Sequence, residues 1–294
     1  MDCSVILVTF QSAAFVRRCV ESVAQSTHQA SFEIIAVDNA SSDGTAALLE
    51  RGHPAVRVLH NTENVGFGPA ANQAARLATG RYLLFLNPDT EVQDHAIDRA
   101  VAFADAHEDV GILGGKLLNP DGTLQRAARR SIPYPSVAFF QLSGLGRIWR
   151  NHPAAGAYNL ERLDPERTAD VGAVSGAFLL IRRDVWGRVG GFDERFFLYG
   201  EDLDLCLAVT RLGFRVVYYP EAAVLHHKGA SSRQARRRAN REFHRAMRLF
   251  HDKHFAAGQP LPVNALIRGA IAVRGGLSDL ALRLGLRRHV GTKG

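Results

Sequence analysis

Polar and acidic side chains follow three short apolar segments in the first third of the chain. Thr9 closes the first segment, Asp38 and Asn39 follow the second, and Asn87 and Asp89 follow the third. Carboxylate oxygens are the ligands that hard divalent cations prefer, and they also accept hydrogen bonds from ring N–H groups. These positions therefore predict a polar binding site. The alternative is local structure, because Asn-Pro-Asp also suits a turn whose last residue caps a helix.

A second group of acids lies late in the chain, where Glu201, Asp202 and Asp204 fall within four positions. Carboxylates raise one another's pKa where they are close and desolvated, which suits proton acceptance near neutral pH. The aromatic run at 196–199 precedes them and would shield them from water. The alternative is that they occupy the first turn of a helix, where the helix dipole favours negative charge.

The elements that must position these residues alternate between strands and helices up to residue 120. The expected strands are 5–10, 33–37, 56–60, 82–86 and 110–113. Apolar residues at helical spacing from Phe15 to Val23 predict a first helix, and Ser41, Ser42 and Asp43 form a capping cluster for the second. This alternation predicts a mostly parallel α/β sheet covered on both faces, which binds ligands beyond the carboxyl ends of its strands.

Regular patterns weaken between residues 119 and 170, where a turn at 119–122 and scattered prolines indicate a variable excursion. They return at 171–182. A helix over 202–212, a strand over 215–219 and a basic helix over 232–255 are expected to follow.

Composition places the chain among ordinary globular proteins. Of its 294 residues 46% are hydrophobic and 22% charged, which excludes a disordered, collagenous or coiled-coil chain. The three cysteines, Cys3, Cys19 and Cys206, fit neither a disulfide framework nor a metal knuckle, so we expect a reducing, cytoplasmic compartment. The apolar run at 5–10 is too short for a secretory signal, and 263–273 is too short to cross a membrane.

Charge is distributed unevenly along the chain. Residues 1–227 carry a formal net charge of −5 and residues 228–294 one of +12. One stripe of the basic helix consists of Arg237, Arg241, Arg245 and Arg248. This stripe fits either a solvated face or contact with anionic lipid headgroups. A nucleic-acid-binding module is a further alternative, disfavoured because few aromatic residues interleave with the arginines.

The glycine pattern Gly66-x-Gly68-x-x-Ala71 resembles a dinucleotide fingerprint, and Asp89 follows at about the expected 20 residues. A nicotinamide-dependent Rossmann oxidoreductase is therefore an alternative function. Two features disfavour it: five residues separate the glycines from the preceding strand, and the glycines belong to the third β-α turn.

Several motifs together resemble family 2 glycosyltransferases of the GT-A fold, in the rhamnosyltransferase-like branch. They are Val8-Thr9-Phe10, Val37-Asp38-Asn39-Ala40-Ser41-Ser42-Asp43-Gly44-Thr45, Asn64-Val65-Gly66-Phe67-Gly68, Asn87-Pro88-Asp89, Gly190 to Phe197, Gly200 to Leu205, and Pro220 with His226 and His227. The resemblance covers residues 3–230. It predicts a catalytic domain at 1–230, with a nucleotide-binding half at 1–118 and an acceptor and catalytic half at 119–230. A basic helical region at 231–294 follows.

The resemblance implies an inverting, metal-dependent glycosyltransferase that uses dTDP-L-rhamnose or a UDP-sugar. The acceptor would be a hydroxyl of a lipid-linked or cell-surface glycan, and the protein would lie in the cytoplasm, with a peripheral contact to the inner membrane face. Asp202 would be the base with Glu201 in support. Asp89 would hold Mg²⁺ or Mn²⁺ together with His226, although the residues alone do not distinguish His226 from His227.

Four residues are expected at the nucleotide: Thr9, Asp38, Asn72 and Asn87. Asp38 can accept the imide N–H of uracil or thymine, or it can begin an Asx turn, and both roles are compatible. Asn87 replaces the first acid of the family's D-x-D motif and offers only a neutral carbonyl oxygen.

Overall fold

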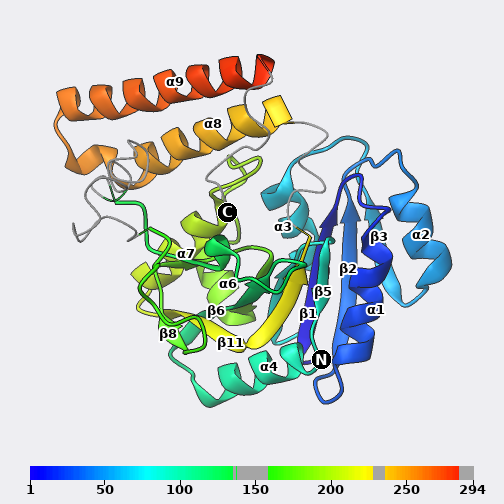
Figure 1. Cartoon of the computed structure of the whole chain (residues 1–294). Helices are drawn as coiled ribbons and strands as arrows, with labels where there is room; N and C mark the ends of the chain where they lie inside the picture. Colours follow the sequence, from blue (N-terminus) through cyan, green and yellow to red (C-terminus); the bar gives the residue numbers. More distant parts are fainter. Residues whose placement is uncertain (135–136, 138–157, 228–235, 285–294) are drawn as a thin grey trace.

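The computed structural model describes residues 1–134, 137, 158–227 and 236–284. A twisted central sheet has helices on both faces, and two long C-terminal helices lie side by side near one end of it (Figure 1). The expected α/β class with a mostly parallel sheet is confirmed. Among the described residues the sheet order is β3-β2-β1-β4-β10-β6-β11-β5.

The first four strands match the expected ones closely and run parallel to one another. They are β1 (Cys3–Thr9), β2 (Phe32–Asp38), β3 (Val56–His60) and β4 (Tyr82–Leu86). The following strands are β5 (Thr90–Val92), β6 (Val110–Leu118), β7 (Arg129–Arg130), β8 (Ala169–Asp170), β9 (Ala173–Val174), β10 (Phe178–Arg182) and β11 (Arg215–His226). Strand β10 runs antiparallel between β4 and β6, and β7 pairs with β9 in a small separate sheet.

The helices fill the connections between these strands. They are α1 (Val16–Ser26), α2 (Thr45–Gly52), α3 (Phe67–Leu77), α4 (Ala96–Ala106), α6 (Arg183–Val189), α7 (Glu201–Arg211), α8 (Arg236–His254) and α9 (Leu261–Arg283), with short 3₁₀ turns at Arg126–Ala128 and Ala256–Gly258. Helix α7 begins one residue before the expected start. Positions 232–235 of the expected basic helix lie outside the described residues.

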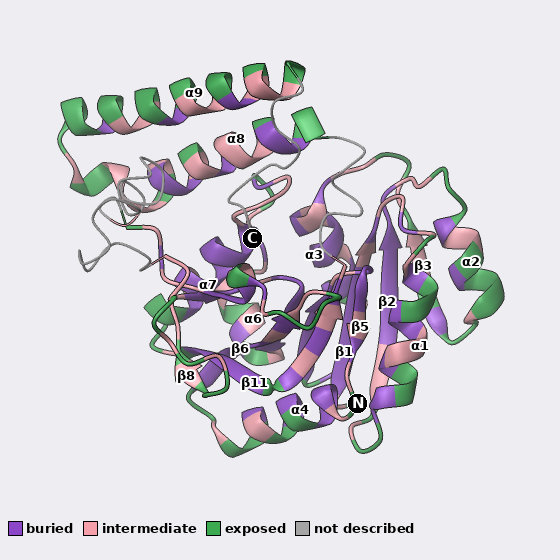
Figure 2. Cartoon of the chain, in the orientation of Figure 1, coloured by how far each residue is buried: buried purple, intermediate pink, exposed green. Residues whose placement is uncertain are grey.

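One hydrophobic core lies on each face of the sheet, between the strands and the helices, and the central strands are largely buried (purple in Figure 2). Successive residues of a strand point to opposite faces, so Val5 and Leu7 join the core under α1 and α4, whereas Ile6 joins the core under α3, α6 and α7. Burial on both sides explains why these strands read as continuous apolar runs. Because both faces of the sheet are covered, polar residues can gather at the carboxyl ends of the parallel strands.

Strand β11 is longer than expected, and this length matters for the site. The sequence predicted an end at residue 219, because Pro220 has no N–H for the ladder. The strand instead passes an irregularity between Tyr219 and Ala223 and continues to His226, where it pairs antiparallel with the short strand β5. The sequence analysis did not predict β5.

The basic helix α8 is attached to the catalytic part of the chain. Its Ala246 and Phe250 belong to the same core as α7, and Lys253 and His254 contact the Asp204 carboxylate at 2.8 and 2.7 Å. Helix α9 packs along α8. The proposed boundary at residue 230 falls between the described segments and stays a prediction.

Candidate active site

Three of the expected site residues meet where β4 ends. The Nε2 atom of His226 lies 3.3 Å from the Asp89 Oδ1 atom and 3.3 Å from the Asn87 Nδ2 atom. The Asp89 and His226 side chains are both buried. A carboxylate and an imidazole that face each other offer one oxygen and one nitrogen ligand, a donor set that suits Mn²⁺ and is compatible with Mg²⁺.

The two adjacent histidines have different surroundings. The β5–β11 pairing places His226 opposite Thr90, next to Asp89. His227 turns away: its Nε2 atom lies 2.8 Å from a Glu91 carboxylate oxygen, and its ring packs against the ring of Phe15. The structure therefore favours His226, not His227, as the histidine beside Asp89.

Gln125 orients the His226 ring. Its side-chain oxygen lies 2.9 Å from His226 Nδ1, and its side-chain nitrogen donates to the His226 carbonyl at 2.7 Å. An amide oxygen only accepts, so Nδ1 carries a proton, and in a neutral imidazole the lone pair of Nε2 then faces Asp89. This is the tautomer that a metal ligand needs. The sequence analysis missed Gln125, which lies in the stretch assigned as a variable excursion.

Asp202, the expected base, forms a buried ion pair with Arg130. The Asp202 Oδ2 atom accepts from Arg130 Nη2 at 2.6 Å and from the Gly176 backbone N–H at 3.2 Å. Pairing of β7 with β9 brings Arg130 to this position. Such contacts fix the orientation of the carboxylate. Arg130 was also missed, because its segment carries no periodic signal.

The three carboxylates at the start of α7 have different partners, and the expected effect of neighbouring acids on pKa is seen at Glu201. Asp204 points to Lys253 and His254 of α8, and Asp202 points to Arg130. Glu201 is buried, and among the described residues its Oε2 atom has no hydrogen-bond partner. Burial, reinforced by the charge of Asp202, raises the pKa of Glu201 to about 8.

The metal and base groups are joined by two adjacent residues just before β10. The Gly176 N–H donates to Asp202, and the Ala177 carbonyl accepts from the Asn87 backbone N–H at 3.2 Å. A single backbone segment thus links the end of β4 with the start of α7. The candidate cation ligands and the candidate base therefore belong to one site.

Asp38 and Thr9 lie together at the carboxyl ends of β1 and β2. The Thr9 hydroxyl donates to Asp38 Oδ1 at 2.9 Å, and the Ser41 N–H donates to Asp38 Oδ2 at 2.9 Å. The bond from Ser41 joins the carboxylate to the backbone three residues on, so the local turn role weighed as an alternative is present, though not as a strict Asx turn. It does not consume every lone pair of the carboxylate, so a nucleotide contact stays a prediction.

Asn72 has a structural role that the sequence analysis did not anticipate. Its side-chain nitrogen donates to the Phe192 carbonyl at 2.9 Å and to Glu194 at 3.0 Å, while its oxygen accepts from the Phe192 N–H at 3.0 Å. Both amide hydrogens are used within the protein. The arrangement fastens α3 to the loop before α7 and disfavours the expected nucleotide contact.

The glycine pattern at Gly66 is explained by a backbone contact. Gly66 has a φ of +94°, and a Cβ at this position would lie 2.5 Å from the Phe197 carbonyl oxygen. The next residue, Phe67, donates its N–H to the same oxygen at 2.9 Å. The glycine therefore permits close approach of the 197 loop, which accounts for it without a dinucleotide.

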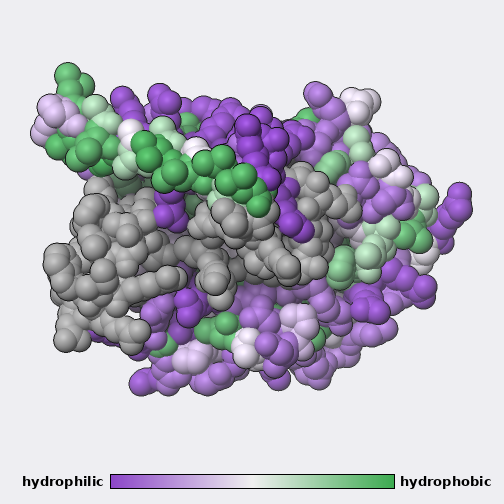
Figure 3. Space-filling view, turned by 45° about the horizontal axis from the view of Figure 1, so that its top comes forward, coloured by the Kyte–Doolittle hydropathy of each residue, from purple (hydrophilic) through white to green (hydrophobic). Residues whose placement is uncertain are grey.

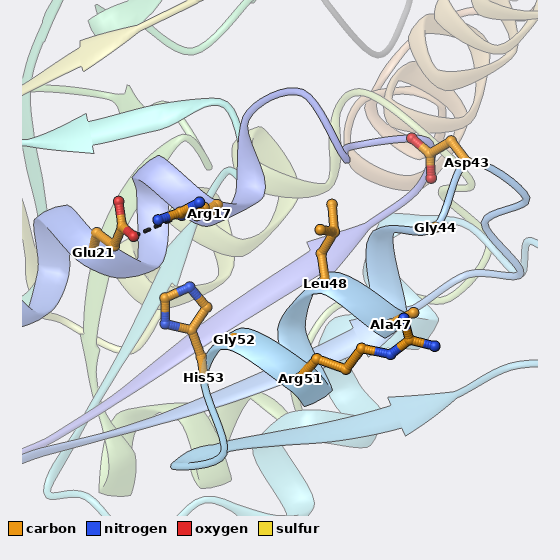
Figure 4. A pocket seen from close by; sticks show the side chains of 9 residues that line it. All are labelled: Arg17, Glu21, Asp43, Gly44, Ala47, Leu48, Arg51, Gly52 and His53. Carbon is orange, nitrogen blue, oxygen red and sulfur yellow. Dashed lines mark hydrogen bonds and ion pairs between the residues drawn. The ribbon is translucent and has the colours of Figure 1, made fainter.

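A hollow between α1 and α2 is a separate feature of the surface (Figure 4). It contains the Arg17–Glu21 ion pair, Leu48 and Asp43. The Asp43 carboxylate already accepts hydrogen bonds from Ala13 and Thr45. The hollow includes none of the expected site residues.

Comparison with known proteins places this geometry in a family. The family described as glycosyl transferase family 2 matches residues 4–188, and glycosyl transferase family group 2 matches residues 155–261. The chain is 32% identical over 296 residues to an N-acetylglucosaminyl-diphospho-decaprenol L-rhamnosyltransferase of Mycobacterium tuberculosis, a match that covers 97% of this chain and 94% of that protein. It is 34% identical to an O-antigen biosynthesis protein of Myxococcus xanthus, over 78% of this chain and 17% of that protein.

Solved structures give the same fold. A mannosyltransferase of Pyrobaculum calidifontis in complex with GDP-Man and Mn²⁺ superposes with a TM-score of 0.59 at 17% identity, over 97% of this chain and 81% of that one. Residues 1–349 of Staphylococcus aureus TarS superpose with a TM-score of 0.58 at 18% identity, over 93% and 71%. With its GT-A fold and these sequence matches, the chain belongs to glycosyltransferase family 2 and is an enzyme of that family.

Proposed function

We propose that the protein is an inverting, metal-dependent rhamnosyltransferase acting on a lipid-linked glycan. The donor would be dTDP-L-rhamnose, with UDP-sugars as the next candidates. Support comes from the 32% identical rhamnosyltransferase, whose name specifies a diphospho-decaprenol acceptor and which this chain matches over 97% of its length. The nicotinamide alternative is abandoned, because the family is established and Gly66 has a structural explanation.

One arrangement carries the mechanistic proposal: His226 lies 3.3 Å from both Asp89 and Asn87, and the segment at Gly176 and Ala177 joins the Asn87 backbone to Asp202. Asp89 and His226 would hold the cation. When bound, Mg²⁺ or Mn²⁺ supplies the positive charge that stabilises a departing diphosphate. A related fold solved with Mn²⁺ and GDP-Man supports a divalent ion in general.

Asp202 would take the proton of the acceptor hydroxyl. As the acceptor oxygen forms its bond to the anomeric carbon, the bond from that carbon to the diphosphate breaks on the opposite face, which inverts the configuration. The proton passes to the Asp202 carboxylate, and the electron pair leaves with the diphosphate. Arg130 and the Gly176 N–H would hold the carboxylate in place before reaction. Glu201 would support the base electrostatically.

Thr9, Asp38 and Asn87 would contact the nucleotide. Asp38 sits at the sheet edge with its carboxylate held by Thr9 and Ser41. An oriented carboxylate can accept the imide N–H that uracil and thymine share, which suits both UDP and dTDP donors. Asn72 is omitted from this set for the structural reason given above.

We also propose that the enzyme works in the cytoplasm at the inner face of the membrane, where a lipid-linked acceptor would be available. Within the described segments, no helix is long and apolar enough to cross a membrane. The excess of positive charge in the C-terminal region favours contact with anionic lipid. Nucleic acid is not proposed as a partner.

Replacement of Asp89 tests the cation site. Asp89→Asn removes the anionic ligand, so we expect the affinity for UDP or dTDP in the presence of Mn²⁺ to fall at least about tenfold, with transfer sharply reduced. Isothermal titration calorimetry with and without Mn²⁺ measures this effect. Glu91→Gln, at the nearby carboxylate that contacts His227, is the matched control and should bind as the wild type does. Full activity and unchanged affinity in Asp89→Asn would reject the assignment.

Paired substitutions at the start of α7 test the base. Asp202→Asn should lower turnover by about 10²- to 10⁴-fold while donor affinity changes by only a small factor, because a proton acceptor acts on chemistry more than on binding. Glu201→Gln should lose less. Steady-state transfer kinetics and donor titration separate the two effects. If Glu201→Gln proves the more damaging of the two, the role of base passes to Glu201.

The raised pKa of Glu201 predicts a pH-dependent stability. Folding raises this pKa from 4.5 to about 8, so the folded chain holds the proton more tightly than the unfolded chain does. The contribution to stability is therefore complete below pH 4.5 and is lost as the pH rises through about 8. Between pH 5 and 8.5 the wild type should lose at least about 1 kcal/mol of unfolding free energy relative to Glu201→Gln.

Urea unfolding at several pH values measures this difference. Glu63→Gln, at an exposed position, should follow the wild-type pH curve. Parallel curves for the wild type and Glu201→Gln would show that Glu201 ionises as freely in the folded chain as in the unfolded one.

A further inference from the structure

Helix α9 exposes a continuous apolar stripe. Its three buried residues, Asn264, Ile271 and Ser278, are seven positions apart and define the inner face. The outer face is formed by Leu266, Val273, Leu277, Leu280 and Leu284, whose exposed fractions are 74, 64, 64, 52 and 63%. At 3.6 residues per turn these five side chains align along one side of the helix. Figure 3 shows hydrophobic residues gathered along this helix.

This arrangement reverses the usual polarity of a surface helix. Helices on globular proteins bury their apolar side and expose their charges. In α9 two of the three buried residues are polar, and the outer face carries aliphatic side chains with Gly269 and Gly276 between them. The charged residues of α9 lie outside this stripe, and among them Arg268 pairs with Asp252 and Arg283 with Asp279. A helix face that contacts only water would not be expected to carry a continuous row of aliphatic side chains, so this stripe indicates a binding surface.

Positive charge surrounds the stripe. Residues 236–284 contain ten Lys or Arg residues and three Asp or Glu residues. Arg236, Arg237, Arg241, Arg245 and Arg248 of α8 are all exposed, and Arg237 pairs with Asp279 of α9 and so helps to hold the two helices together. An uncharged apolar strip bordered by arginines complements an anionic lipid surface. A second copy of the chain would bring the same positive charge to the contact and would be repelled.

We propose that α9 lies in the plane of an anionic lipid bilayer, with its apolar outer face among the upper acyl chains and the α8 arginines at the headgroups. The proposal rests on the proposed function, because it specifies how the enzyme reaches a lipid-linked acceptor. It replaces attachment by the arginine stripe alone with attachment by apolar insertion. At 23 residues α9 is about 34 Å long, and it lies on the bilayer without spanning it.

The position of the helical hairpin fits this role. Strands β1 and β2 point toward the end of the sheet near which α8 and α9 lie (Figure 1). Arg238 of α8 stacks on the ring of Phe197, and the Phe197 carbonyl contacts the loop at Gly66. Lys253 and His254 bind Asp204 of α7. A membrane contact through α9 would therefore hold the bilayer on the side of the sheet where the acceptor must enter.

Vesicle flotation tests the apolar contact directly. The wild type should float with vesicles of phosphatidylcholine and phosphatidylglycerol, and a substantial part should remain bound in 0.5 M NaCl. The combined variant Leu266→Ser, Val273→Ser, Leu277→Ser and Leu280→Ser should bind at least tenfold more weakly. Leu48→Ser with Leu212→Ser, two exposed leucines outside α9, is the matched control and should bind as the wild type does. Circular dichroism and transfer to a short soluble acceptor establish that each variant is folded.

A single labelled position measures insertion without relying on the combined variant. All three native cysteines are buried, so Val273→Cys introduces one reactive thiol for the fluorophore NBD. On vesicles its emission should shift to the blue and be quenched by spin-labelled lipid, whereas NBD at Leu48→Cys should not respond. Complete release by salt together with an unshifted emission would overturn the proposal in favour of electrostatic attachment alone.

The oligomeric state of the variants gives a further decisive outcome. If the wild type is a dimer, the serine variant is a monomer and neither binds vesicles, then a second copy covers the stripe and the proposal is wrong.

The membrane contact and the proposed function can be rejected independently of each other. Transfer to a soluble acceptor without vesicle binding would reject only the membrane contact, whereas vesicle binding by a protein that transfers no sugar would reject only the proposed function.

Discussion

The pairing of β11 with β5 is the constraint on which the candidate site depends. It carries the chain past Pro220 and sets His226 opposite Thr90, so that the imidazole faces Asp89. A shift of one residue would place His227 there instead, because successive side chains of a strand point to opposite faces. Gln125 then selects the tautomer by its contact with Nδ1. The scaffold thus holds one oxygen and one nitrogen atom, the candidate ligands, next to each other.

The start of α7 shows how one short acidic motif can supply three different chemical groups. Arg130 and a backbone N–H bind Asp202, burial raises the pKa of Glu201, and Asp204 binds α8. Charged partners from two separate segments, β7 and α8, and the burial of Glu201 create these differences. The same α8 contact connects the start of α7 to the hairpin whose outer face is apolar, so the proposed base and the proposed membrane contact share one set of packed helices.

Much of the fold follows from the sequence, because buried parallel strands appear as apolar runs and polar residues follow them. Asp89 was predicted for this reason and Asp202 from the acidic cluster at 201–204, both together with the family resemblance. The choice between His226 and His227 needed the strand register, which depends on pairing between distant segments. Gln125 and Arg130 lie in a stretch without periodic signal. A helical C-terminal region was expected, but α9 was not located within it, because its partly polar inner face and apolar outer face reverse the pattern that indicates a surface helix.

The central claim is that Asp89 and His226 together hold the divalent cation, and pulsed electron paramagnetic resonance tests it most directly. Mn²⁺ bound to the enzyme with UDP or dTDP should show ¹⁴N coupling from a directly bound imidazole. The coupling should persist in His227→Gln and disappear in His226→Gln. A coupling that is lost in His227→Gln, or one that is absent from the wild type while Mn²⁺ still binds, would contradict the account.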